Sequence, residues 1–249
     1  MIQLVHVTKV FNAQSTSSIV ALNELNLEIT EGQFIVVVGA NGSGKSTLLN
    51  LLAGSMFADT GRIMIDGNDV TSLKDYERSK FISRIYQNPI TGTAPDLSIL
   101  DNFRIASLRT SKKQLRIGID DAFRKKVADK ISVLQMGLEN KLDVAMGLLS
   151  GGQRQALTLL MSVMDTSKVL LLDEPTAALD PKSALKVMEL TQQLVREYKL
   201  TAVLITHEIK FAHQYGDRII QLAEGKIKRD LNSSEKKALS IQELFEWFL

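Results

Sequence analysis

A glycine-rich turn between an apolar strand and a helix limits the fold of this chain more than any other feature. Residues 39–46 read GANGSGKS, which fits the pattern G-x-x-x-x-G-K-[ST]. Small residues let successive backbone N–H groups face phosphates, and the helix N-terminus adds its positive end. Lys45 would reach the β and γ phosphates, and the Ser46 hydroxyl would bind Mg²⁺. The alternative is a glycine turn that only caps a helix, but the strand and helix on either side favour a phosphate-binding loop.

The surrounding pattern predicts an α/β fold. Residues 1–38 contain short segments of period 2, which indicate antiparallel strands leading into a buried strand. The apolar runs 169–172 and 202–205 flank a helical pattern from about Lys182 to Glu197. Strand, helix and strand in this order are typical of a βαβ unit with parallel strands.

We expect a single domain, because no internal repeat is visible along the 249 residues. Residues 1–87 and 166–230 would form the α/β core, with an antiparallel β subdomain at its N-terminal end. Residues 88–165 have helical spacing and would form an inserted α-helical subdomain. Residues 231–249 would be a helical tail that ends in a short helix, which Ser240 and Glu243 introduce as a capping box.

Composition limits the class of protein without naming a partner. The net charge is +2, so no overall field favours nucleic acid, and the absence of cysteine excludes a disulfide framework. The longest apolar runs are far shorter than the roughly 20 residues that cross a bilayer. Residues 1–7 show no export signal, so we expect a protein of the reducing cytosol.

A second motif follows the apolar run that begins at Val169. This run ends in Asp173 and Glu174, two acidic residues in succession. An aspartate at this place in P-loop ATPases organises Mg²⁺ and its water. Glu174 then becomes the candidate base that activates water. A carboxylate that merely caps a following helix is the alternative, and the phosphate-binding loop argues against it.

A third motif, LSGGQ at residues 149–153, again places a serine and backbone amides before a helical pattern. One γ-phosphate does not need two such cradles in one chain. The economical explanation is that Ser150 and Gly152 serve a nucleotide held by another protomer, which predicts an isologous, head-to-tail dimer.

With LSGGQ unchanged, the chain resembles the ATP-binding cassette ATPases over nearly its whole length. The resemblance implies ATP hydrolysis and further roles for single residues. Gln87 matches a glutamine that contacts the metal and the attacking water. Asp180 matches a residue that helps assemble the opposed site, and His207 matches a histidine that senses the γ-phosphate. Phe11 stands where the family places an aromatic ring against adenine.

These motifs give one predicted site. We expect Glu174, His207 and Gln87 to be catalytic, and Ser46, Gln87 and Asp173 to hold Mg²⁺. The predicted ATP-binding residues are Phe11, Gly39, Asn41, Gly42, Ser43, Gly44, Lys45, Ser46 and Thr47. The residues predicted to act across the dimer are Ser150, Gly151, Gly152 and Gln153, with Asp180 beside them.

The resemblance also implies partners. A homodimer or a pseudo-symmetric dimer would sit on the cytoplasmic face of the cell membrane, bound to integral-membrane permease subunits and served by an extracytoplasmic solute-binding protein. The loop after Gln87, with the sequence NPITGTAP, resembles that of single-cassette bacterial importers, which makes an amino acid or a similar small organic solute the leading expectation.

Two other functions stay open from the sequence. One is a soluble cassette without a permease, such as an ATPase of iron–sulfur cluster assembly. The other is a cassette acting on nucleic acid or ribosomes, but such proteins carry two cassettes or a long coiled coil, so we expect no nucleic-acid partner. His6 and His213 match no motif, and basic residues between Arg104 and Lys130 are interpreted as a solvated helical face.

Overall fold

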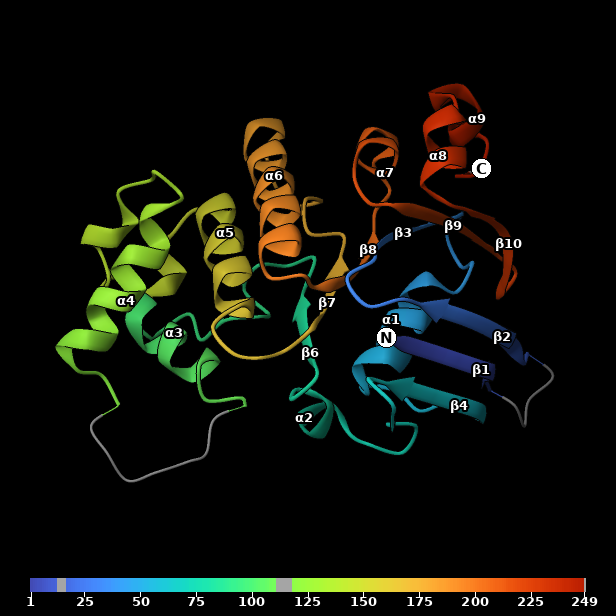
Figure 1. The fold of residues 1–249 in the computed structure, drawn as a ribbon, viewed down its shortest axis with the longest axis horizontal. Coiled ribbons are helices and arrows are strands. Elements are labelled where there is room, and N and C mark those ends of the chain that lie inside the picture. Colours follow the sequence, from blue (N-terminus) through green and yellow to red (C-terminus); the bar gives the residue numbers. More distant parts are fainter. Residues whose placement is uncertain (13–16, 111–117, 249) are drawn as a thin grey trace.

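The computed structural model describes residues 1–12, 17–110 and 118–248, and its strands form two sheets with helix α1 between them (Figure 1). The smaller sheet has the order β2-β1-β4-β5, and its recorded pairs are antiparallel. Its strands are β1 (Ile2–Phe11), β2 (Ile19–Ile29), β4 (Thr60–Ile65) and β5 (Asn68–Asp69). In the second half of β2 alternate residues are buried, which agrees with the period 2 of the sequence. The predicted N-terminal antiparallel sheet is therefore confirmed.

The larger sheet positions the predicted site. In sheet order its strands are β10 (Lys226–Leu231), β9 (Arg218–Ala223), β3 (Phe34–Val38), β8 (Thr201–Ile205), β7 (Val169–Asp173) and β6 (Ile82–Ile85). Only β10 pairs antiparallel among these strands. Every residue of β3 and β8 is buried, as expected for strands covered on both faces. The carboxyl ends of β3, β7 and β8 lie along one edge, where ligands bind in open α/β sheets.

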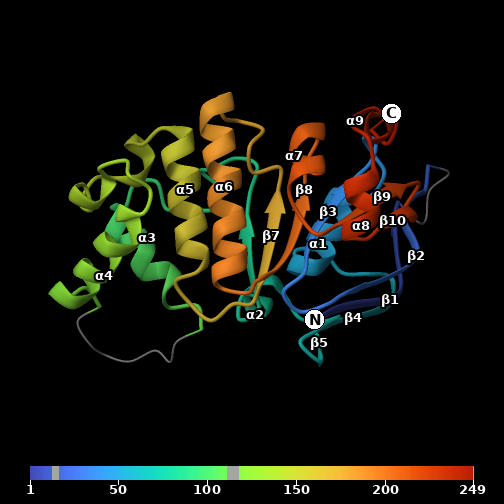
Figure 2. The ribbon, with the colours of Figure 1, turned by 45° about the horizontal axis from the view of Figure 1, so that its top comes forward.

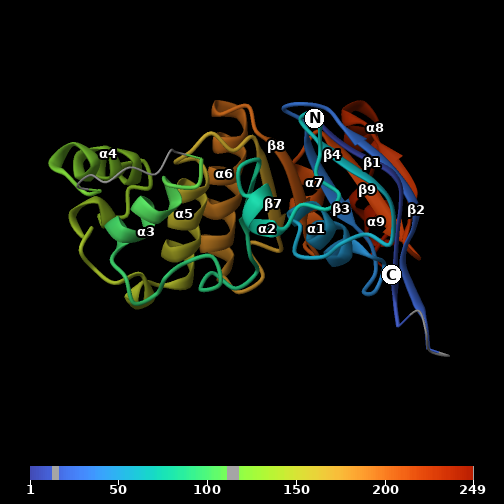
Figure 3. The same ribbon diagram turned by 90° about the horizontal axis from the view of Figure 1, so that it is seen from below.

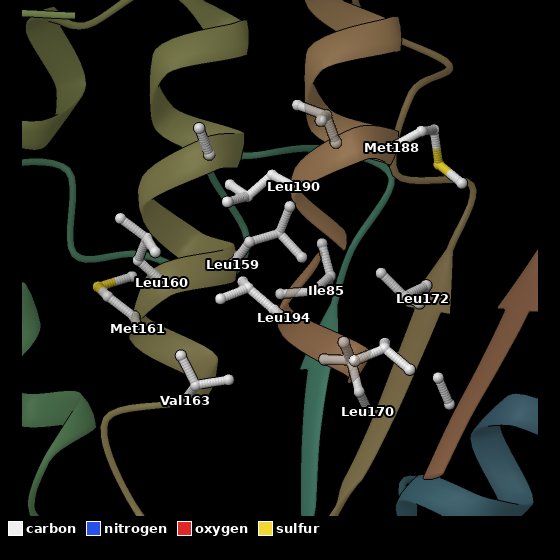
Figure 4. Close-up of a cluster of buried hydrophobic side chains, with 14 of the residues drawn as sticks. Ile85, Leu159, Leu160, Met161, Val163, Leu170, Leu172, Met188, Leu190 and Leu194 are labelled. Atoms are coloured by element: carbon white, nitrogen blue, oxygen red, sulfur yellow. The ribbon is translucent and has the colours of Figure 1, made fainter. Parts of the chain in front are cut away.

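Helix α1 covers the face of this sheet that looks toward the smaller sheet, and α5 and α6 cover the opposite face. The bounds of the helices are α1 (Lys45–Ala53), α2 (Asp75–Arg78), α3 (Ile99–Ala106), α4 (Asp121–Ser132), α5 (Gly151–Ser162), α6 (Pro181–Glu197), α7 (Ile209–Gln214), α8 (Ser233–Ala238) and α9 (Ile241–Phe245), with 3₁₀ turns at Leu138–Asn140 and Met146–Leu148. Helices α5 and α6 stand side by side, and α7 lies farther along the sheet (Figure 2). The close-up shows Leu159 of α5 and Leu194 of α6 near Leu170 and Leu172 of β7, and all four are buried (Figure 4).

Helices α3, α4 and α5 lie at the end of the molecule opposite the antiparallel sheet (Figure 3). They fall inside residues 88–165, where the sequence predicts a helical subdomain, although the division into core, subdomain and tail stays a prediction. Three residues of the expected basic face, Lys112, Lys113 and Arg116, lie outside the described residues. Within the described ranges, no helix combines the length and apolarity needed to cross a bilayer.

The C-terminal tail contains two short helices, α8 and α9, and α9 stands where the sequence predicts a terminal helix. Each begins with a capping box, and the expected box of Ser240 and Glu243 is present at α9. Leu244 is fully buried and Trp247 is 2% exposed, because α9 packs on α7. The tail thus extends the core of the domain.

Candidate functional site

The glycine turn joins β3 to α1 and leaves room only for glycine at two points. A Cβ at Gly39 would lie 2.1 Å from the carbonyl oxygen of Leu222, and one at Gly44 would lie 2.5 Å from that of Ala21. Both glycines also have positive φ angles, 146° and 106°. Helix α1 begins directly afterwards at Lys45 without a side-chain cap, so its first N–H groups remain for a ligand.

The side chain of Lys45 folds back over the loop. Its Nζ atom donates hydrogen bonds to the carbonyl oxygens of Gly39, at 2.7 Å, and Ala40, at 2.9 Å. Burial lowers the pKa of Lys45 from its usual value, and the negative charge of Glu174 acts in the opposite direction. The hydroxyl of Ser43 is buried and has no hydrogen-bond partner among the described residues. A buried ammonium group and an unpaired hydroxyl in a tight turn fit the phosphates of ATP.

The outer edge of the turn is open. Asn41, Gly42 and Ser46 are exposed, and Thr47 is partly buried in the first turn of α1. Gly42 has a φ of 78°, with no atom within 4 Å of the place where a Cβ would stand. The loop therefore presents its backbone to the solvent side.

Asp173 ends β7, where its carboxylate forms an ion pair with Arg84 of β6 at 2.6 Å. Among the described residues, no cluster of three or more His, Cys, Asp or Glu side chains could hold a metal alone. Mg²⁺ does not need one, because it is commonly bound through one or two side-chain oxygens, phosphate oxygens and water. The donor set of Ser46 and Asp173 fits such a site.

Glu174 and His207 come together although they are far apart in sequence. The Nε2 atom of His207 lies 2.8 Å from the Oε1 atom of Glu174. The backbone of Glu174 has a φ of 47°, and its N–H donates to the carbonyl oxygen of Ile205 at the end of β8. Such left-handed conformations in non-glycine residues cluster at functional sites.

Gln87 follows β6 in an exposed position. The carbonyl oxygen of Tyr86 just before it accepts a hydrogen bond from the Nε2 atom of Gln155 at 3.1 Å. The same Gln155 nitrogen donates to the carbonyl oxygen of Pro175 at 2.9 Å, and the residue is fully buried in α5. Gln155 thus joins the segment of Gln87 to that of Glu174, a role that sequence reasoning missed. Its only sequence signal is a polar residue within a largely apolar helix.

Sequence reasoning also did not identify Arg84 as a residue of the site. It bonds Asp173 and also donates to the Oδ1 atom of Asn50 on α1 at 2.9 Å. A charged residue inside a short buried strand was the signal available in the sequence.

The LSGGQ motif begins α5. Ser150 caps the helix, because its hydroxyl accepts a hydrogen bond from the Gln153 N–H, and the Gln153 Oε1 atom accepts one from the Ser150 N–H. A Cβ at Gly152 would lie 2.7 Å from the Ser183 hydroxyl, so the second glycine permits close packing on α6. Within the described part of the chain, no hydrogen bond or ion pair joins residues 150–153 to residues 39–47. The motif and the glycine turn are not brought together in one chain.

Asp180 caps α6, where its Oδ1 atom accepts hydrogen bonds from the N–H groups of Lys182 and Ser183, each at 3.1 Å. Hydrogen bonding to Ser183, and then to the Lys182 backbone, lowers the pKa of this carboxyl. A Cβ at Gly151 would lie 3.3 Å from Leu179, just before Asp180. The start of α5 and the start of α6 therefore lie against each other.

Phe11 ends β1 and pairs with Ile19 of β2, two residues before Ala21, which faces the glycine turn. The Nζ atom of Lys9 stands 5.9 Å from the centre of the half-buried Phe11 ring. Of the histidines without a motif, His213 binds the carbonyl oxygen of Leu239 in the tail.

A groove of about 360 Å³ lies between α3, α5 and the segment after Gln87. Its lining includes Thr91, Thr93, Ile105, Arg109, Thr158 and Met161. Arg84 also lines this groove, so one side chain borders both the groove and the acidic end of β7.

Comparison with known proteins gives consistent matches. Residues 22–177 match the family described as "ABC transporter". The chain is 38% identical over 251 residues to a tyrosine transport ATP-binding protein of Clostridioides difficile (strain R20291), covering 100% of this chain and 98% of that protein. It is 33% identical to a putative hemin import ATP-binding protein of Staphylococcus haemolyticus (strain JCSC1435), covering 91% and 99%. A dimeric ATP-binding cassette bound to ADP and Pi superposes with a TM-score of 0.79 at 30% identity, covering 94% and 99%.

Proposed function

The chain belongs to the ABC transporter family of ATPases, and from this premise we propose that it drives the import of an amino acid or a similar small organic solute. The observation that carries the proposal is the similarity along the whole chain to a tyrosine transport ATP-binding protein. The similarity to a hemin import protein supports import but differs in solute, so the amino acid rests on the first relative.

The site supports hydrolysis by positioning and charge. Lys45 and the free N–H groups of α1 would hold the phosphates of ATP, with Phe11 against adenine. Glu174 would orient and deprotonate the attacking water, and His207 would hold Glu174. Mg²⁺, when bound through Ser46, Asp173 and Gln87, would neutralise phosphate charge.

Two chains would complete each site. Among the described residues, no hydrogen bond or ion pair joins the glycine turn to the LSGGQ motif, which supports a dimer in which Ser150 and Gly152 meet the nucleotide of the opposed protomer. Its partner cassette is either a second copy or a similar chain. Asp180 would lie beside this contact, since the start of α6 packs on the start of α5.

We propose that a segment of the permease binds in the groove between α3, α5 and the segment after Gln87. Its wall includes the exposed apolar side chain of Ile105, 52% exposed, among threonines and Arg109. The chain would then lie on the cytoplasmic face of the membrane, and an extracytoplasmic binding protein would deliver the solute.

The test is affinity purification of the tagged chain from solubilised membranes of its own host. We expect a polytopic permease to co-purify with the wild type and with Ile241→Asp, whose exposed position lies in the tail. Ile105→Asp should lose the permease, because a charge would stand on the groove wall. Uptake of labelled tyrosine by cells carrying each variant then tests the solute class. Recovery from the soluble fraction alone, with cluster-assembly proteins, would favour the cassette without a permease.

A further inference from the structure

Arg84 stands where three parts of the site meet, and we propose that it is a positioning residue that fixes Asp173 relative to helix α1. This inference rests on the proposed ATPase site but not on the permease. Figure 2 shows β6, which carries Arg84, beside β7, which ends in Asp173.

The guanidinium group of Arg84 makes contacts in three directions. Its Nη2 atom lies 2.6 Å from the Oδ2 atom of Asp173, and its Nη1 atom donates to Asn50 at 2.9 Å and to Ser55 at 3.4 Å. The Tyr86 ring lies under the guanidinium, with 4.8 Å between Cζ and the ring centre. The two side chains of the ion pair are only 12% and 20% exposed, so solvent screens the pair weakly.

The contact between Arg84 and Asn50 matters because of where Asn50 lies on α1. Asn50 follows Ser46 by four residues on α1, so the two side chains lie on the same face of the helix, one turn apart. Ser46 and Asp173 are the residues predicted to hold Mg²⁺ together with Gln87. Arg84 therefore bridges the helix of one predicted ligand to the carboxylate of the other.

Mg²⁺ demands a near-ideal octahedral arrangement of oxygens, so the spacing of its ligands matters more than for a flexible site. The Nη2 atom of Arg84 binds the Oδ2 atom of Asp173, which restricts the rotation of the Asp173 side chain. The Oδ1 atom would then remain for the metal or its water. The Tyr86 ring, directly before Gln87 in the chain, contacts the guanidinium group and restrains its position.

The test uses the purified full-length chain and a non-hydrolysable ATP analogue. The affinity for the analogue is measured by calorimetry in excess Mg²⁺ and again in EDTA. The ratio of the affinity in Mg²⁺ to the affinity in EDTA is called the gain from Mg²⁺. Arg84→Met is compared with Arg84→Lys and with Arg218→Met. Arg218 is a matched control, because it forms a similar cross-strand pair with Asp230 at 2.6 Å, between β9 and β10.

We expect Arg84→Met to cut the gain from Mg²⁺ by about tenfold or more, as for other residues that orient metal ligands, while affinity in EDTA changes by less than about twofold. Arg84→Lys should recover part of the gain, since it keeps the charge but not the fork. Arg218→Met should keep the full gain even if its melting temperature falls. The KM for Mg²⁺ in ATP hydrolysis should rise in Arg84→Met.

An unchanged or larger gain in Arg84→Met would overturn the proposal, since Arg84 would then be structural or would compete with the metal. If Arg84→Met does not fold, Asn50→Leu cuts the same bridge at α1, and an unchanged gain there overturns the proposal equally. A failed co-purification of the permease would leave these results standing, so the two proposals fail separately.

Discussion

The Nε2 atom of His207 and the Oε1 atom of Glu174 lie 2.8 Å apart, so a side-chain contact joins the segments that follow β8 and β7. The Glu174 side chain is 19% exposed and that of His207 is 40% exposed, which leaves the pair open on the side of His207. A carboxylate held in this way keeps one orientation toward a ligand at the sheet edge.

Glu174→Gln should bind ATP nearly as well as the wild type but hydrolyse it roughly 10² to 10⁴ times more slowly, as expected for loss of a general base. Glutamine has almost the same shape and leaves Lys45 and the glycine turn in place. The variant should also accumulate as a dimer with ATP. Steady-state kcat, nucleotide binding and size-exclusion chromatography measure these outcomes, and a kcat near that of the wild type would remove Glu174 from the role of base.

His207→Ala should lower kcat by about tenfold or more with a smaller effect on ATP affinity, because Glu174 loses the partner that orients it. His213→Ala is the matched control, since His213 binds a backbone carbonyl in the tail. Both variants lose an imidazole, but only His207 contacts Glu174 at the predicted site. Equal kcat values for the two would contradict the prediction.

Gln155→Met should destabilise the domain by roughly 1–3 kcal/mol, because one buried and one partly buried hydrogen bond to carbonyl oxygens are lost. The same change should lower kcat more than it raises KM, since those carbonyls belong to Tyr86 and Pro175 on either side of the site. Gln242→Met in the exposed start of α9 serves as the control. Denaturant unfolding and ATPase kinetics test both parts, and a loss of stability with unchanged kcat would limit Gln155 to packing.

Lys236 should make stability depend on pH in the alkaline range. Its Nζ atom is buried and donates to the carbonyl oxygens of Tyr215 and Gly216, and burial lowers its pKa to about 8. Between pH 8 and the unfolded pKa near 10.5, the unfolded chain holds a proton that the folded chain has released. The free energy of unfolding should therefore rise with pH across this window, by roughly 3 kcal/mol relative to a variant without the amine.

Lys236→Met provides that variant, and Lys237→Met, at an exposed neighbouring position, is the control. Urea unfolding at pH 7.5, 9 and 10.5 gives the difference between the wild type and each variant. The free energy of unfolding of the wild type minus that of the variant should increase with pH for Lys236→Met and stay constant for Lys237→Met. A constant difference for both would mean that Lys236 stays protonated when buried.

The parts of the fold and site that sequence predicted are those carried by short segments. The glycine turn between β3 and α1, the acidic end of β7 and the helix α6 each depend on neighbours in the chain, so pattern and spacing suffice. The contacts of Arg84 and Gln155 depend on pairing between strands and helices that are distant in sequence. Arg84 and Asp173 are 89 residues apart, and Gln155 and Tyr86 are 69 apart, so no local pattern specifies them.

The tail illustrates a second limit. A capping box at Ser240 predicted a helix start correctly, but α8 before it has only six residues, and short helices owe their stability to packing more than to propensity. The predicted roles of Ser150 and Asp180 across a dimer also depend on a second chain, and within one chain both residues serve as helix caps.

The close approach of Gly152 to Ser183, and of Gly151 to Leu179, has a consequence for how two chains would engage. A Cβ at Gly152 would lie only 2.7 Å from the Ser183 hydroxyl, so glycine at this position holds the start of α5 close against the start of α6. LSGGQ and Asp180 would therefore move together as one unit when they approach the nucleotide of the opposing chain. Dimer formation would then bring both elements to the nucleotide in one step. A bulky residue at position 152 would change the position of LSGGQ relative to Asp180.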